Sequence, residues 1–221
     1  MSNPAITAVI WDVDGTLADT IPLCVEALAT AISSHGGPDL SPDQIIGRFG
    51  PSEEGLLRNE LGDRWVEAIE TYLDEYERAH HDATLVFTEV RDLILALAEA
   101  GVPMAVVTGK GPRSAAITLD LIGLGDAFEH VAAGSMDGPV KSTEIRRIIG
   151  AWGLEPTRVA YVGDSPSDIT EARAAGVIAI GAAWKPGADP SILEPHEPDA
   201  ILLSESDLVS WITSALDGDP N

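Results

Sequence analysis

The stretch VIWDVDGTLADT, residues 9–20, ends an apolar run with two aspartates that stand on either side of one valine. The run over residues 5–12 is apolar and β-branched enough to form a buried strand. Alternate side chains of a strand point to opposite faces, so Val13 lies opposite Asp12 and Asp14, and both acids can face one ligand. A simple polar turn would explain Gly15, but it would not require two carboxylates that repel each other. The stretch therefore predicts a site that uses both acids.

The rest of the chain is first helical and then alternates between helices and strands. From about Thr20 to Phe87 the apolar spacing predicts helices with no strand among them. After Thr88, helices alternate with predicted strands at residues 102–108, 130–133, 158–164, 177–181 and 200–203. This alternation is typical of a parallel α/β sheet covered by helices on both faces. We expect a Rossmann-like three-layer core from residues 1–18 and 88–221, with a small α-helical cap domain at residues 19–87.

Composition limits the partners. The 221 residues include 36 acidic and 13 basic side chains, for a net charge of −23, and 45% are hydrophobic. Such a surface repels nucleic acid and anionic membranes, and no apolar run approaches the roughly 20 residues of a membrane span. A single cysteine, Cys24, and the absence of a signal-peptide pattern in MSNPAIT predict a cytoplasmic protein. The sequence contains no exposed heptad pattern, so it does not indicate an oligomeric state.

Polar side chains follow several of the predicted strands. Asp12 and Asp14 follow the first, Thr108, Gly109 and Lys110 follow the second, and Asp164 with Asp168 follows a later one. Open parallel sheets bind ligands at the carboxyl ends of their strands, so we expect these groups to meet at one edge. Four carboxylates need a cation, and oxygen ligands favour Mg²⁺. Such a metal would let an acidic protein bind a phosphate.

These residues resemble the four motifs of the haloacid dehalogenase superfamily, in order. The motifs are DVDGT (12–16), a strand-terminal threonine at 108, Lys141, and GDSPSD (163–168). The resemblance spans about residues 6–215. The helical stretch between the first two motifs is similar to the small cap of phosphoglycolate phosphatase and β-phosphoglucomutase.

The resemblance implies a role for each site residue. Asp12 would be the nucleophile that forms an aspartyl-phosphate, and Asp14 would be the general acid and then the base. Mg²⁺ would be held by Asp12, the backbone carbonyl of Asp14 and Asp164, with Asp168 as a further ligand or orienting residue. Thr108 and the amide of Gly109 would bind the phosphoryl oxygens.

The lysine of the third motif has two candidates. Lys141 would neutralise the charge on the nucleophile and the phosphate. It stands in GPVKST rather than the commoner lysine-proline context, and the second motif reads TGK where many relatives carry asparagine or serine after the threonine. Lys110 is therefore an alternative for the same role.

The sequence favours one activity over its rivals. Asp14 favours phosphate chemistry over dehalogenation, and no lysine lies in the cap to form the Schiff base of a phosphonatase. We therefore predict a Mg²⁺-dependent phosphatase that acts on a small phosphorylated metabolite. A hexose-phosphate phosphomutase and a phosphate-binding protein without turnover are the alternatives. In the cap segment IIGRFGPSEE (45–54), Arg48 is predicted either to contact an anionic or polar part of the substrate beyond the phosphate or to lie on the helix surface.

Overall fold

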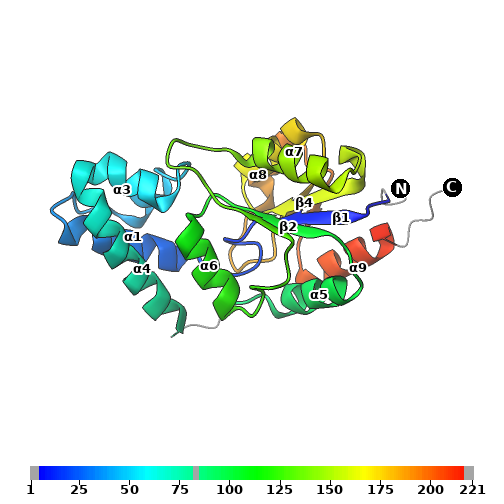
Figure 1. The fold of residues 1–221 in the computed structure, drawn as a ribbon, viewed down its shortest axis with the longest axis horizontal. Helices are drawn as coiled ribbons and strands as arrows, with labels where there is room; N and C mark the ends of the chain where they lie inside the picture. The colour runs from blue at the N-terminus through cyan, green and yellow to red at the C-terminus, as the bar shows by residue number, and fades with distance from the viewer. Residues whose placement is uncertain (1–4, 82–84, 217–221) are drawn as a thin grey trace.

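A parallel six-stranded sheet forms the centre of the protein. The computed structural model describes residues 5–81 and 85–216, and the strand order is β3-β2-β1-β4-β5-β6. Figure 1 labels three strands of this sheet, β1, β2 and β4. Every neighbouring pair of these strands is parallel. The strands are β1 (Ala8–Trp11), β2 (Met104–Val107), β3 (His130–Ala132), β4 (Val159–Gly163), β5 (Ile178–Ala182) and β6 (Ala200–Leu202). The predicted Rossmann-like sheet is confirmed.

Side chains of β1 point alternately to the two faces of the sheet, and each face has its own apolar core. Val9 and Trp11 belong to a core shared with α5 (Thr88–Glu99) and α9 (Glu205–Leu216). Ala8 and Ile10 belong to another, shared with α7 (Lys141–Trp152) and α8 (Pro166–Ala175). All four residues of β1 are buried, as expected of a central parallel strand. The sheet therefore has helices on both faces, which makes three layers.

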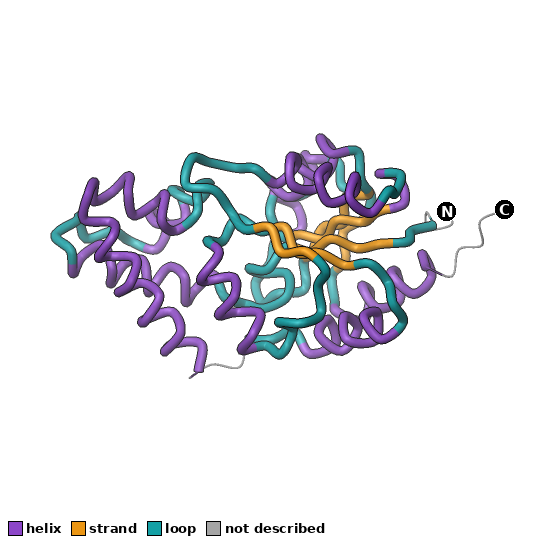
Figure 2. Tube along the Cα trace, viewed as in Figure 1, coloured by secondary structure: helices purple, strands orange, loops and turns teal. Residues whose placement is uncertain are grey.

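Four further helices form a separate group at the left of Figure 1. They are α1 (Ile21–Ser34), α2 (Pro42–Ile46), α3 (Glu53–Leu61) and α4 (Trp65–His81). Their buried apolar side chains make a third core, in which Leu28, Leu57 and Tyr72 are fully enclosed. This separate core supports our proposal that residues 19–87 form a cap domain. Figure 2 shows the cap as helices joined by loops, with all of the orange strands outside it.

Two connecting segments, one at Ala18 and one at Val86, join the cap to the core, and they lie side by side. Ala18 and Val86 form an antiparallel bridge, and the amide of Asp19 donates to the carbonyl of Leu85 over 2.9 Å. The helix α6 (Pro112–Leu121) packs against the cap helix α4 from the core side. Short 3-10 helices occupy Gly62–Arg64, Pro156–Arg158, Pro190–Ile192 and Glu194–His196. Over the described residues, no helix is both long enough and apolar enough to cross a membrane.

Candidate active site

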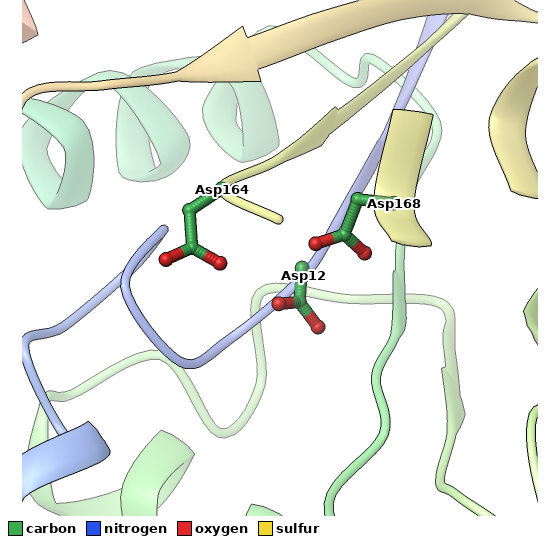
Figure 3. Close-up of side chains that lie close together, drawn as sticks. All are labelled: Asp12, Asp164 and Asp168. Carbon is green, nitrogen blue, oxygen red and sulfur yellow. The ribbon is translucent and has the colours of Figure 1, made fainter. Parts of the chain in front are cut away.

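Three buried carboxylates meet at the carboxyl ends of the central strands. Asp12 follows β1, Asp164 follows β4, and Asp168 lies in the first turn of α8. Each offers an oxygen, and these oxygens lie within 4.8 Å of one another. Figure 3 shows the three carboxylates around a common space between the strand ends. The structure thus brings together three of the four acids that the sequence placed at this edge.

Glycines allow these acids to approach so closely. Gly15 has φ +76°, and a Cβ there would collide with the carboxylate of Asp164. A Cβ on Gly163 would lie 2.5 Å from the Cβ of Asp168. Both motifs therefore need a glycine beside the aspartate. At Gly15 there is a second reason, because residues with a side chain rarely adopt a positive φ.

Asp168 is fixed by the helix that carries it. Its carboxylate accepts hydrogen bonds from the backbone amide and the hydroxyl of Ser165, at 3.0 and 2.6 Å, and from the Tyr161 hydroxyl at 2.8 Å. Ser165 in turn caps the helix by accepting from the amide of Asp168. Burial would raise the pKa of Asp168, but Lys141 and these hydrogen bonds outweigh it and hold that pKa below its ordinary value.

Lys141 links Asp12 to Asp168. Its Nζ lies 2.9 Å from Asp12 Oδ1 and 2.5 Å from Asp168 Oδ1. Burial disfavours its ammonium group, but the two carboxylates outweigh that effect and hold the pKa of Lys141 well above its usual range. Burial raises the pKa of Asp12 to about 7, with Lys141 acting against it and the neighbouring aspartates adding to it. Lys141 is therefore charged and placed to neutralise Asp12.

Lys110 occupies a different place from Lys141. Its Nζ lies 3.2 Å from Asp14 Oδ1, 3.1 Å from Cys24 Sγ and 3.5 Å from Glu53 Oε1. It also stands 4.2 Å from the centre of the Tyr76 ring, a cation–π contact. Of the two lysines that the sequence offered, Lys141 contacts Asp12, and Lys110 contacts Asp14 and the cap.

Asp14 is held apart from the carboxylate cluster. Besides Lys110, its side chain accepts a short hydrogen bond from the hydroxyl of Thr20 at the entrance to the cap. Its side chain is 22% exposed, and it lines the same cavity as Asp12. A carboxylate in this position can exchange protons with a ligand in the cavity while Asp12 faces the cluster.

Glu53 joins the cap to the core, a role that the sequence did not reveal. It begins α3, where an acid suits a first turn, but its oxygens accept from the Ser114 hydroxyl and the Tyr72 hydroxyl at 2.8 and 2.9 Å. It also accepts from the amide of Gly111, the residue that precedes α6. These partners lie up to 61 positions away in the chain, so no local pattern could have indicated the contact.

Lys185 is the other site residue that the sequence analysis missed. It donates a short hydrogen bond to Asp164 Oδ2 from the loop that follows β5. Burial raises the pKa of Asp164 to about 6, and Lys185 opposes the rise. Its position after a strand of the sheet, as with the other site residues, is the signal that could have found it.

A cavity of 690 Å³ opens between the strand ends and the cap. Thr108 and Gly109 line it beside Asp12, as do cap residues on both sides of Arg48. Arg48 itself does not line it, because its side chain pairs with Glu60 at 2.6 Å and donates to the carbonyl of Gln44. The cap segment predicted to reach the substrate lies at the cavity, but the arginine in it points elsewhere.

The sheet, the acid cluster and the lysine beside it define an α/β protein with a buried carboxylate site at the carboxyl ends of its central strands. The sequence profile of the haloacid dehalogenase-like hydrolases matches residues 9–182. The chain belongs to this family, and it is an enzyme of the phosphatase type.

Individual relatives agree with this assignment. A phosphoglycolate phosphatase of Chromobacterium violaceum is 30% identical over 196 residues, which cover 83% of this chain and 88% of the relative. A protein of Caldanaerobacter subterraneus subsp. tengcongensis, provisionally named the pyrophosphatase PpaX, is 33% identical over 200 residues, 89% of this chain and 90% of the relative. The structure of CbbY from Rhodobacter sphaeroides in complex with phosphate has a TM-score of 0.72 at 21% identity, covering 92% of this chain and 96% of that one.

Proposed function

We propose that this protein is a Mg²⁺-dependent phosphatase that hydrolyses a small phosphomonoester through an aspartyl-phosphate on Asp12. One observation carries the proposal: Asp12 is buried beside the ammonium of Lys141, within 4.8 Å of two further carboxylates. The named activity of the Chromobacterium relative and the phosphate bound to CbbY support a phosphorylated small molecule as the substrate.

The acid cluster fits a divalent cation. Its donors are carboxylate oxygens only, which Mg²⁺ prefers, and burial raises the pKa of both Asp12 and Asp164. A bound cation would stabilise the ionised forms of these acids. Asp12, Asp164 and the backbone carbonyl of Asp14 would hold it, with Asp168 supporting Lys141 or serving as a further ligand. When bound, Mg²⁺ would offset negative charge on the carboxylates and the phosphate.

The reaction needs two proton transfers, and both are assigned to Asp14. The Asp12 carboxylate attacks phosphorus, the ester bond breaks, and Asp14 gives its proton to the leaving oxygen. Water then attacks the phosphorus of the aspartyl-phosphate, gives a proton to Asp14, and releases inorganic phosphate with Asp12 restored. Thr108 and the amide of Gly109 bind the phosphoryl oxygens during both steps.

Lys141 and Lys110 have separate tasks in this scheme. Lys141 offsets the charge on Asp12 and on the incoming phosphate, which would otherwise repel each other. Lys110 and Thr20 hold the side chain of Asp14 at the cap side of the cavity. Membership of a hydrolase family sets aside the alternative of a phosphate-binding protein without turnover.

The proposal is tested by phosphate release from a panel of phosphorylated metabolites, with Mg²⁺ and with EDTA. We expect release that requires the metal and that Asp12→Asn abolishes. The panel includes β-glucose 1-phosphate, because formation of glucose 6-phosphate without phosphate release would identify the phosphomutase alternative instead. Absence of metal-dependent release, with Asp12→Asn equal to wild type, would overturn the proposal.

A further inference from the structure

The wall that the cap contributes to the cavity is largely apolar. Leu28 and Leu56 form its buried part, and Ile46, Phe49 and Ile192 stand around it with 46%, 45% and 50% of their surfaces exposed. Eight large apolar side chains are exposed over the described residues, and three of them line this one cavity. A cluster of exposed apolar side chains at a concave site indicates that the site binds a ligand with an apolar part.

The cavity has few cations, and each is paired. Among the described residues that line it, the only cations are Lys110, Lys141 and Lys185. Lys110 lies between Asp14 and Glu53, Lys141 contacts Asp12 and Asp168, and Lys185 contacts Asp164. Arg48 and Arg58, the arginines nearest in sequence to the lining segment, pair with Glu60 and Asp137 instead.

Counted with every carboxylate ionised, the site has no excess positive charge for a second anionic group. Five carboxylates face three ammonium groups here, which leaves two negative charges. One divalent cation would offset these two charges and leave a neutral site for a phosphate dianion. A second anionic group on the substrate would meet the apolar wall without a partner, in a protein whose net charge is −23.

We propose that the substrate is the phosphate ester of an uncharged alcohol with an apolar part, which packs against Phe49, Ile46 and Ile192. This inference rests on the proposed phosphatase function and narrows its substrate class. It distinguishes the protein from relatives whose names carry a substrate with two anionic groups, phosphoglycolate or pyrophosphate. The apolar wall contacts the leaving group, and only the phosphate interacts with the charged residues of the cavity.

An isosteric pair of substrates tests the role of charge. 2-Phosphoglycolate and 2-phosphoglycolamide have nearly the same size and differ in one negative charge on the leaving group. With Mg²⁺ present, we expect kcat/KM for the amide to exceed that for the acid by about tenfold or more, since an unpaired carboxylate in an apolar site is unfavourable. Pyrophosphate should be hydrolysed more slowly than either ester.

A second pair tests the apolar wall. Benzyl phosphate and ethyl phosphate release alcohols of similar acidity, so their ratio of kcat/KM reports contact with the benzyl ring. Phe49→Ala should lower this ratio on the order of tenfold. Val66→Ala is the matched control, because Val66 is also an exposed apolar residue of the cap (57% exposed) but does not line the cavity. It should leave the ratio unchanged.

A third variant adds the missing cation. Ile46→Arg should raise kcat/KM for 2-phosphoglycolate relative to its amide. A wild-type preference for 2-phosphoglycolate or pyrophosphate, lost in Lys185→Ala, would overturn the inference and show that Lys185 binds the second anion. Metal-dependent turnover in that experiment would leave the proposed function intact. If no ester is hydrolysed and Asp12→Asn equals wild type, the proposed function fails and this inference with it.

Discussion

Replacing Lys110 with methionine tests the buried ion pair between the cap and the core. The lysine side chain is 1% exposed and has Asp14 at 3.2 Å and Glu53 at 3.5 Å. Methionine has a similar length but no charge, so Lys110→Met leaves both carboxylates without a cation. Removal of one partner from a buried ion pair costs about 3–5 kcal/mol. For a protein of this size that corresponds to a fall in Tm of roughly 6–20 °C.

Thermal unfolding of three variants, compared with wild type, separates charge from packing. Lys110→Met should be the least stable, and the double variant with Glu53→Gln should recover part of the loss, because one of the uncompensated charges is then removed. Arg113→Met is the matched control, since Arg113 also joins core to cap through Glu70. Those side chains are 55% and 59% exposed, so the control should change Tm little.

The comparison can refute this reasoning directly. If Lys110→Met lowers Tm no more than Arg113→Met does, burial does not make the Lys110 cluster more important than an exposed pair. If Glu53→Gln lowers the stability of Lys110→Met further, the two carboxylates are not the source of the loss. Circular dichroism at a temperature below the transition shows that each variant is folded before the comparison is made.

Other predictions concern the carboxylate cluster and Arg48. Asp12→Asn should lower turnover by several orders of magnitude while Tm in Mg²⁺-free buffer stays within the range of a folded protein; turnover near the wild-type rate would rule out Asp12 as the nucleophile. The pKa of Asp12 is raised from 3.8 to about 7, so its contribution to stability is present below pH 3.8 and is lost as the pH rises through about 7. In EDTA, Asp12→Asn should therefore gain in Tm relative to wild type between pH 5 and pH 8, and an equal difference at both pH values would contradict this. Because Asp12 and Asp164 must be ionised to bind the cation, half-maximal activity should need more Mg²⁺ at pH 6 than at pH 8, which a titration at each pH measures. Arg48→Ala should leave KM within about twofold for every substrate, since the side chain pairs with Glu60; a KM that rises tenfold would show that Arg48 reaches the cavity in the complex.

The sequence predicted the sheet well because its central strands are short apolar runs with abrupt polar ends. The stretch 158–164 contains β4 (Val159–Gly163), and the stretch 102–108 contains β2 (Met104–Val107). Strand ends also placed Asp12 and Asp164 together, since parallel strands bring their carboxyl ends to one edge. Local chemistry was sufficient for these parts of the fold and the site.

Contacts between the cap and the core could not be predicted in the same way. Glu53 suits the first turn of a helix, and nothing near it in the chain indicates that its carboxylate reaches Ser114 and Lys110. Arg48 shows the opposite case, in which a plausible segment reaches the cavity but the side chain finds Glu60 first. Such outcomes depend on how the cap helices pack against the core, and periodicity within a helix carries no information on that.

The two connecting segments between cap and core have a consequence for how enzymes of this kind can diversify. Since Ala18 and Val86 are bridged, the ends of the intervening segment are already adjacent, and a short turn could connect them without moving β1 or α5. Insertions are tolerated best where both ends meet at such a junction. This arrangement would let selection exchange the cap as a unit and change what is recognised, while the carboxylate cluster of the core is kept.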